Sequence, residues 1–294
     1  MSIADAATSR TKAKVEEQVA AVMGDGSLNG GAVGEALPVV RQRSFDQVVR
    51  LYLTEMRLFL RESQVVLFVV GFPVLMVLVL GGVFGTDTDD SGFEFVNPSH
   101  YYVASYFGVV LAAIGLMMLP TQIAGARERG LLRRYDTAGF ARWVFPTVQY
   151  LCGLTFALIG FASLLVTASL TNGVPAPEDL VPTLLGLGLG TLAFISIGVA
   201  LGMLFPTGRA AQGIGMSLFF PMFLLSGGGP PPEALTDGMR AVANWLPLTH
   251  VIRAAQEPWL DIGDGRNHLA IVGGLLVVSL AVWLWRAGRT SRAA

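Results

Sequence analysis

Charged residues are scarce in this sequence of 294 residues: only 14% are Asp, Glu, Lys or Arg, whereas a soluble domain carries roughly a quarter. Hydrophobic residues make up 53%, and the mean hydropathy is +0.59. Several apolar stretches approach or exceed the ~20 residues that an α-helix needs to cross the hydrocarbon of a bilayer. The composition therefore predicts an all-α polytopic membrane protein. It argues against a β-barrel, whose strands would be short and alternating.

Asp, Glu, Lys, Arg and His are also missing from the interior of the apolar stretches. Proton- or sodium-coupled carriers need such groups at depth, and channels of the charged-ring type need rings of them. Membrane hydrolysis would need a carboxylate pair or a constellation of His and Asp, which the sequence lacks. The three histidines, His100, His250 and His268, are scattered at one predicted membrane boundary without metal-ligand spacing. We therefore expect interfacial histidines, with no metal site and no catalytic residues.

Two further absences concern energy and partners. Lysine occurs only at Lys12 and Lys14, and no G-x-x-x-x-G-K-[ST] motif is present, so this chain cannot bind ATP in the P-loop manner. Any uphill work must draw its energy from another polypeptide, and no cofactor is expected in this chain. The net charge of −1 argues against nucleic acid as a partner. The single cysteine, Cys152, cannot form an intrachain disulfide.

The chain divides into a polar tail, an amphipathic helix and a long apolar domain. Residues 1–43 have no apolar run and are expected to be a retained, disordered cytoplasmic tail. Residues 44–63 predict a helix lying in the membrane interface, with arginines off its apolar stripe; a cytoplasmic helix facing a protein core is the alternative. Residues 64–290 are expected to form the transmembrane domain. The predicted apolar stripe of the interfacial helix comprises Phe45, Val48, Val49, Tyr52, Leu53, Met56, Phe59 and Leu60.

Six transmembrane helices are predicted, at 65–85, 101–124, 143–170, 180–205, 210–226 and 268–286. When the tail is placed in the cytoplasm, only Arg240, Arg253 and Arg266 of the 20 basic residues fall outside, whereas the acidic residues divide almost evenly. An asymmetry of arginine and lysine alone follows the positive-inside rule. We therefore expect both termini in the cytoplasm.

Glycine and proline mark packing faces, kinks and one break in the apolar domain. The break is SGGGPPP at 226–232, which ends the fifth span, and the half-apolar interval 227–266 is too polar to cross a membrane. We expect an outer re-entrant or interfacial helical hairpin there, with its non-helical backbone buried in protein. Close helix packing is predicted at Gly186, Gly190, Gly198 and Gly202, and kinks are predicted at Pro73, Pro120 and Pro221.

One strongly basic run, ARERGLLRRYDTAGFAR at 126–142, interrupts the apolar domain on its predicted cytoplasmic side. As a short helix it would place Leu131, Leu132 and Tyr135 on one side, with arginines over the rest. Arginines that only set topology or touch anionic lipid headgroups would not need such exposed apolar residues. A helix that docks into the groove of a partner would need them. We therefore favour docking over the topological alternative.

Four stretches of the sequence resemble permease subunits of ABC-2 type exporters, the group that includes daunorubicin-resistance-like multidrug efflux permeases. They are the amphipathic helix before the first span, ARERGLLRRYDTAGF, FPMFLLSGGGPPPEAL at 220–235 and NWLPLTHVIRAAQ at 244–256. The resemblance covers about residues 44–290, and the order of the stretches makes it specific. Two departures occur: GGGPPP replaces the family's usual single glycine and bulky residues, and Ala254-Ala255-Gln256 stands where an arginine often closes the motif.

The resemblance implies six helices per subunit, a second permease subunit as a homo- or heterodimer partner, and cytoplasmic ATP-binding subunits that hold ATP and Mg. The helix at 44–62 would be a second cytoplasmic contact. Coupling to the ATP-binding subunit is expected from Arg127, Glu128, Arg129, Gly130, Leu131, Leu132, Arg133, Arg134 and Tyr135. The export path is expected to include Leu116, Met117, Met118, Phe219, Phe220 and Met222, and the outer gate Ser226, Gly227, Pro247 and Leu248.

The leading functional hypothesis is a non-enzymatic permease subunit of an ATP-driven exporter for an amphipathic drug or lipid-like substrate. Its expected location is the plasma (inner) membrane of a bacterium, in contact with membrane lipid. A polysaccharide or teichoic-type exporter of the same superfamily is one alternative. The other alternative is a non-transporting membrane scaffold or sensor whose basic segment only binds lipid.

Overall fold

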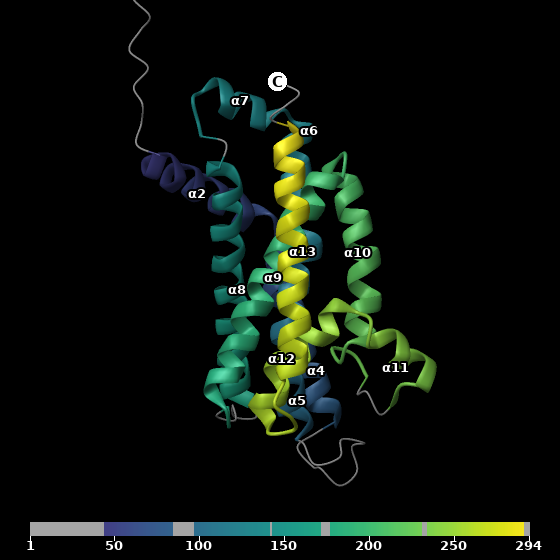
Figure 1. Cartoon of the computed structure of the whole chain (residues 1–294). Helices are drawn as coiled ribbons and strands as arrows, with labels where there is room; N and C mark the ends of the chain where they lie inside the picture. The colour runs from purple at the N-terminus through teal and green to yellow at the C-terminus, as the bar shows by residue number, and fades with distance from the viewer. Residues whose placement is uncertain (1–43, 85–96, 142, 172–176, 231–233, 291–294) are drawn as a thin grey trace, which may run out of the picture. The chain divides into compact units, whose positions relative to one another are not determined.

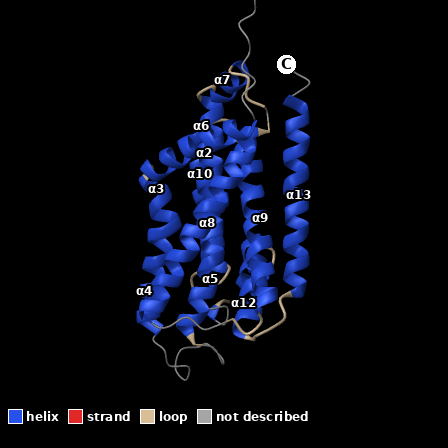
Figure 2. Ribbon diagram, turned by 90° about the vertical axis from the view of Figure 1, so that its left-hand side faces the viewer, coloured by secondary structure: helices blue, strands red, loops and turns tan. Residues whose placement is uncertain are grey.

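The computed structural model describes residues 44–84, 97–141, 143–171, 177–230 and 234–290, and regular secondary structure in this part of the chain is helical throughout (Figures 1 and 2). The predicted disordered tail at 1–43 lies outside the described residues. In chain order the elements are α2 (Ser44–Arg61), α3 (Ser63–Val66), η1 (Leu67–Gly71), α4 (Phe72–Phe84), α5 (Pro98–Ala112), η2 (Ala113–Met118), α6 (Leu119–Glu128), α7 (Leu131–Thr137), α8 (Val144–Thr171), α9 (Leu180–Leu204), α10 (Gly208–Leu225), α11 (Asp237–Ala243), α12 (Pro247–Leu260) and α13 (Arg266–Thr290). Helix α7 lies at one end of the long helices, here called the α7 end, and α11 and α12 lie toward the other, the hairpin end (Figure 1).

Five of the described helical segments are long and apolar enough to cross a membrane: Ser63–Leu80, Pro98–Glu128, Val144–Thr171, Leu180–Leu204 and Arg266–Trp283. They confirm a multi-pass α-helical membrane protein and overlap the predicted first, second, third, fourth and sixth spans. The predicted fifth span corresponds to α10, which is not among the five. Arg209 and Gln212 lie in its first turns and lower its mean hydropathy.

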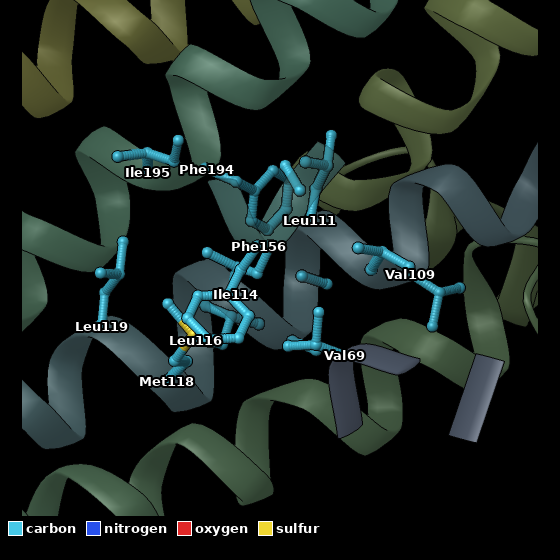
Figure 3. Close-up of a cluster of buried hydrophobic side chains, with 14 of the residues drawn as sticks. Val69, Val109, Leu111, Ile114, Leu116, Met118, Leu119, Phe156, Phe194 and Ile195 are labelled. Atoms are coloured by element: carbon cyan, nitrogen blue, oxygen red, sulfur yellow. The ribbon is translucent and has the colours of Figure 1, made fainter. Parts of the chain in front are cut away.

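The central element is the continuous helix α5–η2–α6, because the most apolar 18 residues of Pro98–Glu128 are 100% buried. Helices α4, α8, α9, α10 and α12 pack around it and cover it on all sides. By contrast, only 22% of the corresponding window in Ser63–Leu80 and 11% in Arg266–Trp283 is buried, which leaves those helices at the periphery. Figure 3 shows the core cluster, which includes Val69, Val109, Leu111, Ile114, Leu116, Met118, Leu119, Phe156, Phe194 and Ile195.

The four glycines of α9 confirm the predicted packing face. A Cβ at Gly186 would lie 2.4 Å from the Ala254 carbonyl oxygen of α12, and one at Gly198 would lie 2.8 Å from the Gly115 carbonyl oxygen of η2. Gly190 and Gly202 meet side chains of α12 and α6 equally closely. Small residues therefore let α9 approach both the central helix and the hairpin, as in other membrane helix interfaces.

Two of the three predicted proline kinks coincide with π-helical segments. The segment η1 ends two residues before Pro73, and η2 ends two residues before Pro120. Proline lacks the N–H for the normal helical bond, and its ring collides with the carbonyl four residues earlier. A π turn adds room at this point. Pro221 lies inside α10, which continues past it.

Helix α2 lies obliquely across the α7 end of α8 (Figure 1), with only part of its predicted stripe buried. Its protein-facing side consists of Gln47, Val48, Leu51, Glu55 and Phe59, whereas Phe45, Val49, Leu53 and Leu60 are exposed. The predicted stripe thus spans two adjacent faces, of which one packs on α8 and the other is free for lipid. Hydrogen bonds and a ring contact fix the packed face: Tyr52 Oη lies 2.8 Å from Thr155 Oγ1, and the Phe59 and Phe156 rings are 5.5 Å apart.

Candidate functional site

The basic segment forms a turn and a short helix at the α7 end. Helix α6 stops at Glu128, and Gly130 takes a left-handed conformation with φ of 69°, which glycine adopts without strain. Helix α7 follows over Leu131–Thr137. The exposed residues of this segment are Glu128, Arg129, Arg133, Arg134, Asp136, Thr137, Ala138 and Gly139, and Arg142 lies outside the described residues.

The three apolar residues of α7 do not form the exposed group that the sequence predicts. Leu131, Leu132 and Tyr135 are half-buried and pack against the chain's own core. The Tyr135 ring lies 5.4 Å from the Phe140 ring and 6.1 Å from the Phe145 ring. The apolar side of α7 therefore finds its partner within the chain, and the surface left for another protein is the arginine side.

A cavity of about 270 Å³ lies beneath α7. Its wall combines Leu132 and Tyr135 of α7 with residues of five other helices, among them Leu51, Phe145 and Trp283. Helix α7 borders this space with Leu132, Arg133, Tyr135 and Asp136.

Arg127 and Glu128, at the end of α6, hold the connection between α9 and α10. The Arg127 guanidinium donates to the Met203 carbonyl oxygen at 2.6 Å and lies 3.3 Å from that of Gly202. A cation at this place satisfies the free carbonyls of a helix C-terminus. Glu128 Oε2 accepts from the backbone N–H of Gly208, the first residue of α10, at 3.0 Å. These two coupling candidates thus contact the chain itself, which the sequence did not indicate.

A buried carboxyl group, which was not predicted from the sequence, lies on the side of α2 that packs against α8. The Glu55 side chain is 6% exposed. Burial raises its pKa, while a hydrogen bond to Gln149 and the charge of Arg129 act in the opposite direction. Arg129 therefore interacts electrostatically with α2 from the turn before α7. In the sequence, Glu55 lies on the same helical face as Leu51 and Phe59, and this spacing was the available signal of its burial.

A polar recess and a small apolar cavity form an inlet between α3, the central helix and α10. The recess, of about 520 Å³, includes Arg129 and Arg209, and the smaller cavity, of about 30 Å³, includes Phe68, Val69 and Met117. Four residues line both: Glu62, Thr121, Gln122 and Gln212. The inlet therefore runs from a polar mouth to an apolar end.

Hydrogen bonds between amides and a carboxylate define the mouth of the inlet. Gln122 Nε2 donates to Glu62 Oε2, and Gln212 Nε2 donates to Gln64 Oε1 at 2.6 Å. Burial raises the pKa of Glu62, and the charge of Arg129 opposes that shift. The mouth thus offers amide donors and acceptors beside the carboxyl groups of Glu62 and Glu128 and the guanidinium groups of Arg129 and Arg209.

The export-path candidates are divided between this inlet and the core. Met117 and Met118 line the small cavity. Leu116 and Phe219 are buried in the core, with the Phe219 ring 6.1 Å from that of Phe68. Phe220 is 43% exposed on the outside of α10, and Met222 is half-buried. The structure therefore brings two of the six residues to the inlet.

At the hairpin end, tyrosines of α5 hold the glycine turn that follows α10. Tyr106 Oη donates to the Gly228 carbonyl oxygen at 2.8 Å, and Tyr102 Oη donates to that of Gly229 at 3.1 Å. Gly227 has φ of 94°, and a Cβ there would lie 2.7 Å from Tyr101 Oη. The turn therefore needs glycine at position 227 to lie this close to α5.

The outer-gate candidates meet around the same turn. Ser226 is 5% exposed, and its Oγ lies 2.9 Å from Thr249 Oγ1 of α12, while Leu248 is fully buried beside it in sequence. Gln256 of α12 donates to Ser105 Oγ of α5 at 2.8 Å. Pro247 starts α12 and is half-buried. Together the tyrosines, the glycine turn and α12 form a closed polar seam, here called the gate seam.

The histidines are not all scattered, contrary to the expectation from sequence. His250 Nδ1 of α12 lies 2.9 Å from His268 Nδ1 of α13. The two residues are 18 positions apart and meet because the chain reverses between these helices. Only His100, at the start of α5, stands apart from this pair in the described structure.

Replacing Tyr106 with phenylalanine tests the gate seam. The change leaves the buried Gly228 carbonyl without its donor, which costs about 1–3 kcal/mol locally. We expect faster amide hydrogen exchange in the 226–229 turn, measured by mass spectrometry. Tyr52→Phe is the control, because it removes a tyrosine hydrogen bond at the α7 end. Equal exchange in the turn for both variants would show that Tyr106 does not hold it.

Comparisons with known proteins identify the family. The family model described as ABC-2 type transporter matches residues 46–258. The chain is also similar to the inner membrane transport permease YhhJ of Escherichia coli (strain K12) and to its namesake in Shigella flexneri, each at 25% identity over 162 residues. These matches cover 52% of this chain and 42% of each relative, so the chain spans less than half the length of the curated relatives it matches. Because the family model covers well over half of the chain, this protein belongs to the ABC-2 type transporter family.

Proposed function

We propose that the chain is the membrane-spanning permease subunit of an ATP-binding-cassette exporter, which moves an amphipathic drug or lipid-like substrate out of the cytoplasm. A separate subunit hydrolyses the ATP. Family membership supports the transport role, and the lack of a P-loop motif in the sequence supports the separate energy source. The observation that carries the substrate class is the inlet, whose polar mouth leads to an apolar end.

The proposed topology has six spans, with α10 as the fifth and with α11 and α12 as an outer re-entrant hairpin. Helix α10 packs along η2 and α6 within the bundle, which supports its role as a span despite its modest hydropathy. Arg209 lies at its α7 end, where it lines the polar recess together with Arg129. Placing the α7 end in the cytoplasm satisfies the positive-inside rule, with both termini inside and α2 in the interface.

In the proposed mechanism, the ATP-binding subunit contacts Arg133 and Arg134 on the exposed face of α7 and Arg129 in the turn before it. Movement of α7 reaches α6 directly and, through the contacts of Arg127 and Glu128, reaches the α9–α10 connection. Since α9 packs on α12 through Gly186, the same movement is passed to the gate seam. The cavity beneath α7 gives this helix room to move.

A second permease subunit and membrane lipid share the remaining apolar surface in this proposal. Helices α4 and α13 are largely uncovered within one chain, with exposed side chains such as Leu75, Leu78, Val277 and Val278. Such a surface is stable only against lipid or another apolar protein face. The proposed dimer would place two inlets in one transporter.

The Gln212→Leu variant tests the inlet as the substrate site. The change keeps the size of the side chain and removes an amide that lines both the recess and the small cavity. For an amphipathic fluorescent dye transported with the ATP-binding subunit, we expect KM to rise about two- to tenfold, the value of one hydrogen bond, with binding of that subunit unchanged. Ser217→Ala is the control, because Ser217 is exposed on the same helix and bonds to its own backbone. An unchanged KM in Gln212→Leu would place the substrate elsewhere.

A further inference from the structure

Three side chains join α12 to α13 in one line of contacts at the hairpin end. His250 Nδ1 lies 2.9 Å from His268 Nδ1, and His268 Nε2 lies 3.2 Å from Glu257 Oε1. At one end of the line, His250 Nε2 lies 2.9 Å from the Asn244 carbonyl oxygen. At the other end, Glu257 Oε2 accepts from the backbone N–H of Gly265 at 3.2 Å. The line therefore runs from the turn before α12 to the turn after it.

The hydrogen-bonding groups decide how many protons this line holds. A carbonyl oxygen only accepts, so His250 Nε2 carries a hydrogen. The two Nδ1 atoms share one hydrogen, because two N–H groups cannot point at each other at 2.9 Å. One more hydrogen is needed between His268 Nε2 and Glu257, since a bare nitrogen and a carboxylate oxygen repel. The line is complete only with one proton more than two neutral imidazoles and a carboxylate carry.

Adding one proton to this line of contacts, or removing one from it, eliminates one of its hydrogen bonds. A second extra proton puts an N–H group on both Nδ1 atoms or on both sides of the His268–Glu257 contact. Removal of the extra proton leaves His268 Nε2 without a hydrogen, facing the carboxylate of Glu257. The contacts between α12 and α13 are therefore strongest at intermediate pH and lose a hydrogen bond on both sides of it, as coupled groups do.

The surroundings of His250 keep its ring neutral. Burial lowers the pKa of His250, the Asn244 carbonyl raises it, and the charges of His268 and Arg253 lower it again. A histidine pKa that folding lowers means that the neutral ring contributes stability at high pH. That contribution is lost as pH falls from about 6.5 toward the lower folded-state value. The extra proton therefore lies between His268 and Glu257.

Other charged groups surround the line, among them Asp261 in the turn after α12, and Glu178 and Asp179, whose backbone N–H groups donate to the Trp259 and Pro258 carbonyl oxygens. Arg253 Nη1 lies 3.4 Å from Asn244 Oδ1, and Arg266 at the start of α13 pairs with Asp264 at 3.6 Å. Helix α9 contributes no charged residue between Leu180 and Leu204. Helix α5 contributes His100 and three tyrosines, and the charge of α10 is Arg209, at the opposite end of that helix. The proton count of the line follows from the hydrogen bonds that its own members form.

We propose that His250, His268 and Glu257 form a proton-sensitive latch that fastens the hairpin helix α12 to α13 near neutral pH and loosens in both acid and alkali. Helix α12 also carries Thr249 and Gln256, which bind the gate seam. When the contacts of the latch loosen, α12, which forms one side of the gate seam, is held less firmly. The latch is a property of the fold and does not depend on the proposed transport function.

Nuclear magnetic resonance of ¹⁵N-labelled histidine in the full chain tests the proton count, because the sequence has only three histidines. The His100→Gln variant assigns the third ring. Near neutral pH we expect His250 to be neutral with its hydrogen on Nε2. A neutral His250 with its hydrogen on Nδ1 would overturn the proposal.

Amide hydrogen exchange tests the mechanical consequence. In the wild type, protection factors in α12 are expected to peak near neutral pH and to fall about fivefold or more at about pH 5 and about pH 9.5, the value of one lost hydrogen bond. In Glu257→Gln, the amide can donate to a bare His268 Nε2 while its oxygen still accepts from Gly265. This variant should keep its protection in alkali and lose it only in acid. His268→Gln should show low, flat protection, and His100→Gln the wild-type profile. A bell-shaped profile retained in Glu257→Gln, or a monotonic wild-type profile, would contradict the latch.

Discussion

Replacing Gly215 with alanine is expected to destabilise the protein by about 1–3 kcal/mol or to prevent its folding, because the new methyl group has no space. A Cβ at this position would lie 2.1 Å from the Leu116 carbonyl oxygen and 3.1 Å from its carbon. Both atoms belong to the backbone of η2 in the central helix, so no side-chain rotation relieves the collision. Thermal unfolding of the purified chain in detergent measures the effect.

Gly213→Ala is a matched control on the same helix. A Cβ at Gly213 meets no atom within 4 Å. Alanine is the better helix former by roughly 0.8–1 kcal/mol, so this variant should be as stable as the wild type or more so. Opposite signs for two glycines two residues apart would confirm the contact between α10 and the central helix. A Gly215→Ala variant as stable as Gly213→Ala would show that α10 does not pack there.

Two sets of arginine substitutions should abolish transport for different reasons. Arg127→Ala removes the donor for the carbonyl oxygens at the end of α9. We expect a lower unfolding temperature and at least about a tenfold loss of ATP-driven transport, with the ATP-binding subunit still bound, since a charged hydrogen bond contributes about 1.5–3 kcal/mol. The double variant Arg133→Glu with Arg134→Glu should unfold like the wild type, because both side chains are exposed. It should lose transport by failing to retain the ATP-binding subunit.

The control for these charge changes is Arg266→Ala at the hairpin end. Arg266 forms an exposed ion pair with Asp264, and such pairs contribute little. Copurification, unfolding temperature and transport should therefore stay close to the wild type. If Arg133→Glu with Arg134→Glu retained the ATP-binding subunit in full, the docking surface would lie elsewhere, for example on α2.

The spans were predictable because a long run of apolar residues without charge has few alternatives to a membrane helix. The predicted 143–170 and 180–205 match Val144–Thr171 and Leu180–Leu204 closely. The glycine pairs of α9 were predictable for a related reason: spacing of four places small residues on one helical face. The helical interval after SGGGPPP also appears, as α11 and α12.

The choice of partner for each apolar face was not predictable. Lipid tails are as apolar as leucine, so a pattern of hydrophobic residues cannot tell a lipid-facing side from a protein-facing one. This is why the predicted stripe on α2 combined buried Val48 with exposed Phe45. The same ambiguity made Leu131, Leu132 and Tyr135 look like a surface for another protein, although Phe140 and Phe145 cover part of them.

Polar contacts between residues far apart in the sequence were even harder to predict. Arg127 and Glu128 follow a basic pattern that suits a docking helix, and their bonds to the α9–α10 connection depend on tertiary geometry. His250 and His268 meet only because α12 and α13 reverse direction. Glu55 is buried because the side of α2 that carries it packs against α8. Its position on the helix did not by itself distinguish it from a solvated carboxylate.

Transport by the purified chain in vesicles, with and without a P-loop ATP-binding subunit, tests most directly whether this permease is driven from outside itself. An amphipathic fluorescent dye and ATP would be supplied on the side of the α7 end. We predict no accumulation of dye against a gradient by the chain alone, and ATP-dependent accumulation once the second subunit is present. Accumulation by the chain alone would contradict the account.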